Sequence, residues 1–260
     1  MNADHLPGEE VAFVGALLAA YLKVIESVPR MEIRAMTAPQ TLLHIDASAQ
    51  LHERSHTRKL TRSFVEHWAS LRPHDRVIRR DVGRSPIPAI DHAWIAAAFT
   101  PPKDRTPAMI ERLALSDELI DEVIAADVIV MGVPMYNYGV PAALKGWIDH
   151  VARIGRTFSF DLARGDVPIE PILSGKTLVV LSARGEFGFE PGGLRAHMNA
   201  LDPALAACAH YFGVARADIH TVAIEYQEFK DERYRHSVAA AEAGVLALAE
   251  QLAAPARRAA

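Results

Sequence analysis

Three short segments of the sequence carry side chains suited to chemistry, and each follows an apolar run. Residues 48–57 contain hydroxyl groups and histidines, residues 135–138 contain two tyrosines and an amide, and residues 183–186 contain an arginine, a glycine and a carboxylate. The hydroxyls of the first segment run into a predicted helix, whose free N–H groups and positive dipole end favour a bound phosphate. The tyrosines of the second segment offer flat apolar faces with a polar edge. These residue types predict a phosphate site in the first segment and a ring-binding surface in the second.

The first segment lacks the glycine-rich signatures of the common nucleotide-binding loops. It contains neither G-x-G-x-x-G nor G-x-x-x-x-G-K-[ST], which disfavours a dinucleotide fold and a P-loop NTPase. A phosphate held by hydroxyls instead of glycines and a lysine indicates a mononucleotide. The alternative is an ordinary helix cap, with Ser55 or Thr57 at the N-cap. The residues of this segment alone leave both interpretations open.

The second segment lies between a predicted buried strand and a predicted helix. Residues 128–133 are almost wholly apolar, which is typical of a central parallel strand covered on both faces. Pro134 ends this strand because it cannot donate the next ladder hydrogen bond. Pro141 suits the first turn of a helix, where a missing N–H costs nothing. The helix then carries apolar side chains at helical spacing, namely Leu144, Trp147, Ile148 and Val151.

The rest of the chain alternates between strands and helices. Further strands are predicted at residues 41–45, 76–82, 176–182 and 219–225, and further helices at residues 58–71, 108–125, 200–212 and 232–252. The alternation predicts an α/β fold, a doubly wound five-stranded parallel sheet with helices on both faces. In that order the three segments converge at the switch point between the first and third strands. Long connections at residues 83–107 and 155–175 are expected to be functional loops or linkers.

We predict one main domain, from residue 41 to residue 254, with a tail at residues 255–260. Residues 1–40 form an N-terminal extension, predicted to contain one helix from residue 9 to residue 28. The alternative is that translation starts at Met31 or Met36 and the extension has no function.

Composition restricts the class of protein. The 260 residues carry a net charge of −4, so the electrostatic footprint of a nucleic-acid partner is not indicated. The single cysteine, Cys208, excludes an intrachain disulfide and fits a cytoplasmic setting. The apolar stretch at residues 11–22 is shorter than the roughly 20 residues that a bilayer requires, so no membrane segment is predicted. The 12 histidines lack zinc-ligand spacing, and no metal site is predicted.

The second segment and its surroundings resemble a known family. The Pro-Met-Tyr-Asn-aromatic turn at residues 134–138, followed by Leu-Lys at 144–145 and Thr-Phe at 157–158, is similar to the FMN-dependent NADH azoreductase and quinone reductase family. The resemblance extends over roughly residues 42–252. It implies a flavodoxin-like fold, non-covalently bound FMN, a homodimer, and two-electron reduction of quinones or azo compounds by NADH or NADPH in a ping-pong reaction.

The resemblance also implies roles for individual residues. Ser48 matches the first serine of the family, and Ser55, His56 and Thr57 fall on its phosphate-binding Ser-x-Ser. Residues of the second segment fall on the turn that lines the flavin: Met135, Tyr136, Asn137 and Tyr138. The third segment departs from the family's Ser-Arg-Gly-Gly, since it consists of Ala183, Arg184, Gly185 and Glu186. A carboxylate at Glu186 is expected to disfavour an anionic reduced flavin through like-charge repulsion.

Aromatic side chains outside these segments complete the expected site. Phe160 and Phe187 are predicted substrate-pocket walls that accept flat rings, with ordinary core or dimer packing as the alternative. No catalytic acid is predicted, because the flavin carries the hydride chemistry. Two other functions remain open at this point. One is a flavodoxin-like carrier of single electrons, and the other is a flavin-binding or flavin-free regulatory protein on the same fold.

Overall fold

A five-stranded parallel sheet runs through the computed structural model, which describes residues 38–254. The strands lie in the order β2-β1-β3-β6-β7, with β1 and β3 adjacent at the centre. Their bounds are Thr41–Asp46 for β1, Arg76–Asp81 for β2, Val128–Pro134 for β3, Lys176–Ala183 for β6 and Val214–Ile224 for β7. This is the predicted doubly wound order. The predicted N-terminal helix and the C-terminal tail lie outside the described residues.

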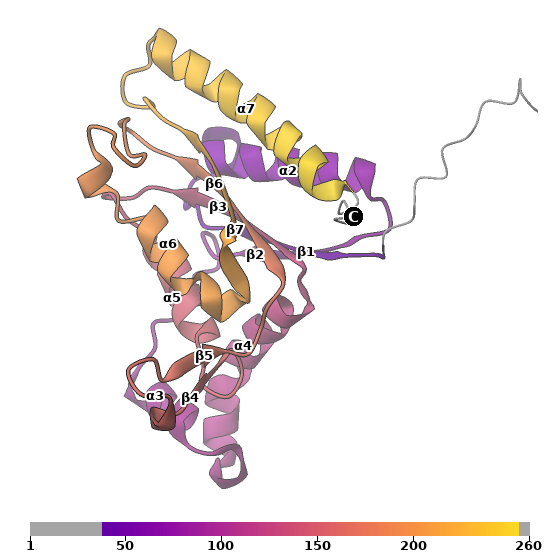
Figure 1. Cartoon of the computed structure of the whole chain (residues 1–260), viewed down its shortest axis with the longest axis vertical. Coiled ribbons are helices and arrows are strands. Elements are labelled where there is room, and N and C mark those ends of the chain that lie inside the picture. The colour runs from indigo at the N-terminus through magenta and orange to yellow at the C-terminus, as the bar shows by residue number, and fades with distance from the viewer. Residues whose placement is uncertain (1–37, 255–260) are drawn as a thin grey trace, which may run out of the picture. The chain divides into compact units, whose positions relative to one another are not determined.

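Helices cover both faces of the sheet (Figure 1). One face carries α2 (His56–Leu71) and α7 (Glu232–Ala253), which pack over an apolar cluster that includes Phe64 and Trp68. The other face carries α4 (Pro107–Ala125), α5 (Ala142–Val151) and α6 (Asp202–Cys208), over a second cluster that includes Trp147. Because it lies between these layers, β3 is buried along its whole length, which explains its unbroken apolar sequence.

The strand register brings the carboxyl ends of the central strands to one edge. Asp46 of β1 pairs with Gly132 of β3, and Pro134 of β3 pairs with Ala183 of β6. The chain continues this alignment beyond the strands, since the N–H of Met135 donates to the carbonyl of Ala183 at 2.9 Å. The three polar segments of the sequence therefore start side by side at this edge.

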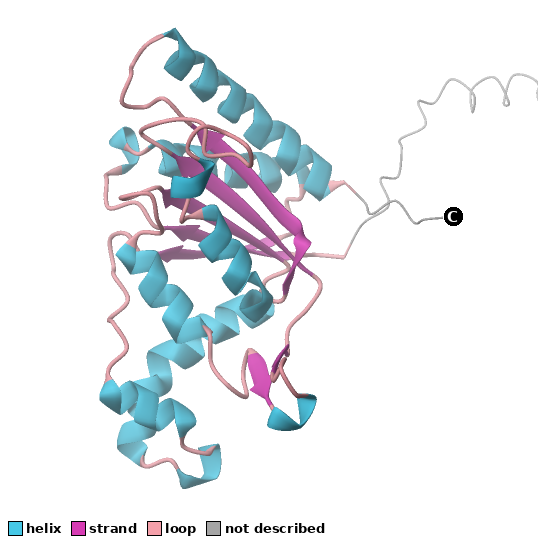
Figure 2. Ribbon diagram, turned by 60° about the vertical axis from the view of Figure 1, so that its left-hand side comes forward, coloured by secondary structure: helices cyan, strands magenta, loops and turns pink. Residues whose placement is uncertain are grey.

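The two long connections contain more structure than the sequence predicts. Residues 83–107 include the helix α3 (His92–Phe99), which begins where the side chain of Asp91 accepts the Trp94 N–H at 2.8 Å. Residues 155–175 include a hairpin of β4 (Phe158–Phe160) and β5 (Ile169–Pro171), which lies apart from the main sheet (Figure 2). Both elements are too short for hydrophobic periodicity to reveal.

Two element boundaries also differ from the prediction. The helix predicted at residues 200–212 is divided into α6 and a 3₁₀ turn, Ala209–Phe212, that ends at Gly213 with φ +79°. The last strand, β7, starts at Val214, five positions before the predicted residue 219. It is an edge strand in which residues 215–218 are exposed and include the charged Arg216 and Asp218, so the sequence has no continuous apolar run there.

Short 3₁₀ turns complete the description, at His52–Arg54, Pro102–Asp104, Leu162–Arg164 and Ala196–Met198. Among the helices of residues 38–254, none combines the length and apolar composition that crossing a bilayer requires. The same residues hold no cluster of three or more histidine, cysteine or acidic side chains arranged around a metal position.

Candidate functional site

Two adjoining cavities open at the carboxyl edge of the sheet. The first has a volume of about 240 Å³ and lies between the loop after β1, the start of α2 and the loops after β3 and β6. The second, of about 360 Å³, lies over the turn after β3. The two share Met135, Gly185 and Glu228 in their walls, so a ligand longer than either cavity can extend across both.

The first cavity is lined by buried hydroxyl groups at a helix N-terminus. Ser48, Ser55 and Thr57 line it, with 2%, 4% and 1% of their surface exposed. Ser55 is the N-cap of the 16-residue helix α2, since its Oγ accepts the N–H of Arg58 at 3.3 Å. Its hydroxyl lies 3.2 Å from that of Thr57, so one of the two hydroxyl hydrogens remains available to donate. The helix cap and the phosphate site are therefore compatible interpretations of these residues.

His56, between these two hydroxyl residues, contributes polarity to the first cavity. Its Nε2 lies 2.8 Å from the hydroxyl of Tyr234 on α7. Burial lowers the pKa of His56, the charge of Lys59 lowers it further, and Glu242 opposes both. The ring is therefore uncharged at neutral pH, and the positive field at this end comes from the helix dipole and from Arg54, which also lines the cavity.

The turn after β3 forms the wall shared by the two cavities. Tyr136 and Gly139 exchange two backbone hydrogen bonds, of 3.1 and 3.0 Å, which close a two-residue hairpin turn. Its central residues, Asn137 and Tyr138, have φ of +48° and +66°, a conformation that such turns require and that non-glycine residues rarely adopt. A bond from the Ala200 N–H to the Tyr138 carbonyl, at 2.9 Å, helps to hold this strained turn.

The side chains of the turn divide between the two cavities. Met135 lines both cavities, Tyr136 lines the first, and Asn137 and Tyr138 line the second. The hydroxyl of Tyr136 accepts the Ala49 N–H at 3.3 Å, which links this turn to the loop after β1. The structure thus brings the first two predicted segments into contact.

The third segment contributes mainly backbone. Ala183 and Gly185 line the first cavity, whereas the side chain of Arg184 is buried elsewhere and pairs with Asp202 at 2.7 Å. A β-carbon at Gly185 would lie 2.8 Å from the Cγ of Glu228, so this position suits glycine.

Glu186 lines the second cavity, and its charge has a partner. One carboxylate oxygen pairs with the Nε of Arg195 at 2.8 Å, and the other accepts the Tyr138 hydroxyl at 3.0 Å. This hydrogen bond, together with the nearby negative charge, raises the pKa of Tyr138. The repulsion that the sequence predicts between Glu186 and an anionic ring is therefore offset by Arg195.

The two predicted wall residues, Phe160 and Phe187, line neither cavity. Phe160 lies in β4 with 48% of its surface exposed. Phe187 stacks on Tyr226, with ring centroids 4.4 Å apart, beneath the guanidinium of Arg195 at 4.7 Å. Phe187 therefore supports the loop at the cavity mouth, and its role as a wall for substrate stays a prediction, as does that of Phe160.

Residues that the sequence analysis misses also line the cavities. Phe189 lines the second cavity, and the centroid of its ring lies 6.2 Å from that of Tyr138. Gln227 and Glu228 follow β7, and Glu228 makes no ion pair with another described residue. The signal that could have found them is the end of the fifth strand, since every strand of a parallel sheet delivers its following loop to the same edge.

The donors of this site fit a phosphate-bearing aromatic group. Buried hydroxyls and a helix N-terminus lie at one end, aromatic side chains lie at the other, and the two cavities are continuous. A family model described as a flavodoxin-like fold matches residues 40–245. The chain belongs to this flavodoxin-like family.

Curated relatives within this family are similar over most of their length. The chain is 50% identical over 218 residues to FMN-dependent NADH:quinone oxidoreductase 2 of Idiomarina loihiensis, an alignment that covers 82% of this chain and 90% of the relative. It is 48% identical to FMN-dependent NADH:quinone oxidoreductase 2 of Colwellia psychrerythraea, over 82% of this chain and 99% of the relative.

Solved structures share the flavodoxin-like fold. The azoreductase of Bacillus anthracis superposes with a TM-score of 0.72 at 23% identity, over 82% of this chain and 99% of the azoreductase. At this identity the similarity concerns the fold alone, and it agrees with the strand order described above.

Proposed function

We propose that this protein is an FMN-dependent NAD(P)H oxidoreductase that reduces quinones and azo compounds. The observation that carries this function is a hydroxyl-lined helix N-terminus continuous with an aromatic-walled cavity, in a chain half identical to an FMN-dependent NADH:quinone oxidoreductase. When bound, FMN supplies the hydride chemistry, taking a hydride from NADH or NADPH and delivering it to the acceptor.

The first cavity binds the phosphate of FMN. The Ser48 hydroxyl and one hydroxyl of the Ser55–Thr57 pair donate hydrogen bonds, and the free N–H groups at the start of α2 add to them. Because these hydroxyls are buried, their bonds to a charged phosphate are each worth about 1.5–3 kcal/mol. His56 lies beside them, uncharged before the phosphate arrives.

The second cavity receives the flat reactants. Met135, Tyr136 and Asn137 would hold the flavin ring, and Tyr138 and Phe189 would contact the nicotinamide and the acceptor. The same surface accepts first the donor and then the acceptor, which predicts ping-pong kinetics. The chain's contribution to the reaction is orientation of these rings and exclusion of competing geometries.

A homodimer is part of the proposal. The β4–β5 hairpin, the turn between its strands and the residue that follows β5 expose large apolar side chains, namely Phe160, Leu162, Val167, Ile169 and Ile172. Exposed apolar patches of this kind mark protein interfaces. We expect Leu162→Glu combined with Val167→Glu to convert a dimer into a monomer in light scattering. A dimer that survives this change uses another surface. The cytoplasmic location remains a proposal that rests on the single cysteine.

The decisive experiment is a visible spectrum of the purified protein, taken before and after anaerobic NADH. A flavin spectrum that bleaches with NADH and recovers with a quinone, with FMN identified on release, supports the enzyme. A protein that cannot be reconstituted with FMN contradicts it and favours a flavin-free regulatory protein. Bleaching that requires a separate reductase favours the single-electron carrier.

A further inference from the structure

A buried arginine lies beneath the first cavity without lining it. Arg58, in the first turn of α2, is 5% exposed. Its guanidinium donates to both carboxylate oxygens of Asp81 at 2.7 and 2.8 Å, to the carbonyl of Ser48 at 2.6 Å and to Asp46 at 3.4 Å. One side chain thus ties the helix that begins at the cavity to the ends of β1 and β2 and to the loop after β1.

The register of β1 against β2 places two carboxylates next to each other, and the positive charge of Arg58 compensates them. Asp46 and Asp81 are paired residues of β1 and β2, so two carboxylates lie side by side at the edge where the cavity opens. Two negative charges on neighbouring strands repel each other strongly when they are partly shielded from water. The hydrogen bond and charge of Asp81 raise the pKa of Arg58, and those of Arg58 lower the pKa of Asp81 against the effect of burial. Arg58 and Asp81 therefore stay ionised together around neutral pH.

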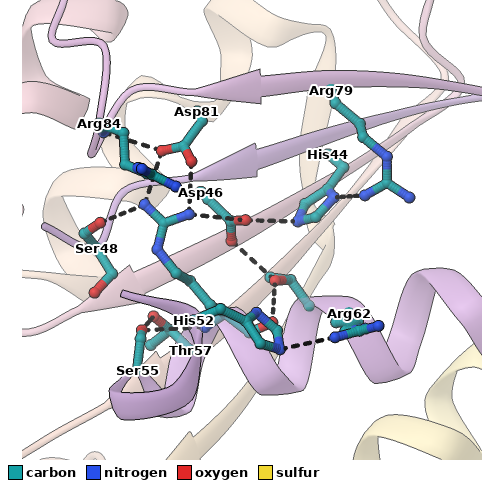
Figure 3. Close-up of polar contacts among 12 residues, drawn as sticks. His44, Asp46, Ser48, His52, Ser55, Thr57, Arg62, Arg79, Asp81 and Arg84 are labelled. Carbon is teal, nitrogen blue, oxygen red and sulfur yellow. Dashed lines mark hydrogen bonds and ion pairs between the residues drawn. The ribbon is translucent and has the colours of Figure 1, made fainter. Parts of the chain in front are cut away.

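Asp46 has further partners that fix its position. Figure 3 shows the side chains of His44, Asp46 and Arg79 in a row along the strands. Arg79 donates to the Nδ1 of His44 at 2.9 Å, and the His44 Nε2 lies 3.3 Å from Asp46. The hydroxyl of Thr61 donates to the other oxygen of Asp46 at 2.9 Å. Arg58 therefore binds to carboxylates that are themselves held in place.

The bond to Ser48 orients the peptide that enters the cavity. In a trans peptide the C=O and the next N–H point in opposite directions. Because the Ser48 carbonyl points to Arg58, the Ala49 N–H points away from it, to the Tyr136 hydroxyl at 3.3 Å. The Ser48 hydroxyl accepts the Gln50 N–H at 3.2 Å, which leaves its own hydrogen to donate.

The backbone of Gly83 also packs against the peptide that follows Ser48. A β-carbon at this position would lie 2.1 Å from the Ser48 carbonyl oxygen, closer than any side chain tolerates. The Gly83 N–H also donates to the Asp46 carbonyl at 3.0 Å. The Ser48 carbonyl is therefore confined between Gly83 and Arg58, with little freedom to rotate.

We propose that Arg58 is a positioning residue for phosphate recognition. It fixes the peptide between Ser48 and Ala49 and neutralises repulsion from Asp46 and Asp81, so that the hydroxyls of the first cavity face an incoming phosphate. This inference rests on the proposed binding of FMN, but it assigns a role to a residue that touches neither cavity. It concerns the phosphate end alone and predicts no contact between Arg58 and the flavin ring.

The test compares FMN with riboflavin, which has the same ring and no phosphate. We expect Arg58→Gln to weaken FMN binding by about tenfold to a hundredfold, the range for loss of charge-assisted bonds, and to change riboflavin binding by less than about threefold. Arg58→Lys keeps the charge without the planar fork, so it should recover part of the FMN affinity. Dissociation constants from fluorescence quenching of each flavin give both ratios.

Two further variants separate positioning from loss of stability. Arg72, at the other end of α2, makes a buried pair with Asp75 at 2.5 Å. Arg72→Gln should lower the midpoint of thermal unfolding and leave the FMN-to-riboflavin affinity ratio unchanged. If Arg58→Gln does not fold, Asp81→Asn can replace it, because it disturbs the cluster only mildly. Asp81→Asn should also lower the ratio of FMN affinity to riboflavin affinity.

Equal losses of FMN and riboflavin affinity in Arg58→Gln or Asp81→Asn would overturn the proposal, as would a folded Arg58→Gln with unchanged FMN affinity. Failure of the proposed FMN binding has a different signature, because the unmodified protein would then bind neither flavin.

Discussion

The two ends of the candidate site are built in opposite ways. At the phosphate end Ser48, Ser55 and Thr57 are almost fully buried, whereas at the ring end Tyr136 and Tyr138 expose 39% and 40% of their surface. The phosphate end is fixed by a buried ionic cluster, and the ring end by a strained turn with few supporting bonds. Under the proposed function, this difference predicts a division of roles, in which the buried end retains the cofactor and the exposed end exchanges reactants.

Charge is arranged differently at the two ends as well. At the phosphate end the buried guanidinium of Arg58 compensates two carboxylates. At the ring end the pair of Glu186 and Arg195 is partly exposed, and exposed pairs contribute no more than about 1 kcal/mol to stability. Substitutions at the phosphate end should therefore change affinity strongly, and those at the ring end should change reactivity with smaller effects on affinity.

The largest effect is expected from removal of the hydroxyls at the phosphate end. Ser55→Ala combined with Thr57→Val should reduce FMN affinity by about 2–4 kcal/mol, because the one free hydroxyl donor of this pair and the helix cap are lost. Riboflavin affinity should change little. Ser70→Ala, which removes an exposed hydroxyl near the other end of α2, is the matched control. Titration calorimetry gives the affinities, and an unchanged FMN affinity would remove the phosphate from this cavity.

A smaller loss of affinity is expected at the ring end. Tyr136→Ala combined with Asn137→Ala should weaken the binding of both flavins by about 1–3 kcal/mol. Nucleic-acid bases, which are similar flat rings, lose a comparable binding free energy when the aromatic side chain that stacks on them is removed. Here FMN and riboflavin should weaken together, in contrast to the phosphate end. If the folded double variant kept full flavin occupancy, the ring would lie elsewhere.

The bond between Tyr138 and Glu186 offers a test without any cofactor. Glu186→Gln removes the negative charge that raises the pKa of Tyr138, so this pKa should fall towards the usual value of about 10. Ultraviolet titration of tyrosinate, with Tyr138→Phe to assign the signal, measures the change. A pKa that does not move would show that the two side chains do not interact in solution.

The smallest effect concerns pH and His56. Burial and Lys59 lower the pKa of His56, with Glu242 opposing, so the unfolded chain binds this proton more readily than the folded chain. The stability that depends on uncharged His56 is therefore complete above the usual pKa of about 6.5 and is lost as the pH falls below it. His56→Asn should flatten this part of the curve of unfolding free energy against pH. A steeper loss in the variant would contradict the assignment.

Much of the central structure is predictable from local sequence. The apolar run of β3, bounded by Pro134, identifies a central strand, and alternation with helices identifies the sheet around it. Ser55 is predictable as a helix start because an N-cap needs a hydroxyl or carboxylate. The central strand and the helix start depend on residues close together in the chain, which is why the sequence predicts them and the structure confirms both.

The supporting contacts are not predictable in the same way. Arg58 lies 23 positions from Asp81, and their bond depends on the register of β1 against β2. Glu228 enters the site only because β7 ends at the same edge as β3. Arg184 is predicted as a cofactor-binding residue, and its side chain pairs with Asp202, a partner 18 positions away that the sequence does not indicate. Such contacts follow from the three-dimensional assembly of strands, which local patterns do not contain.

The most direct test of the division between the two ends is the affinity of the unmodified protein for FMN and for riboflavin, measured by calorimetry under one set of conditions. If the buried phosphate end retains the cofactor, FMN should bind at least about a hundredfold more tightly than riboflavin, as two charge-assisted hydrogen bonds imply. Equal affinities would show that the ring end provides the binding energy, and would contradict a cofactor-retaining role for the phosphate end.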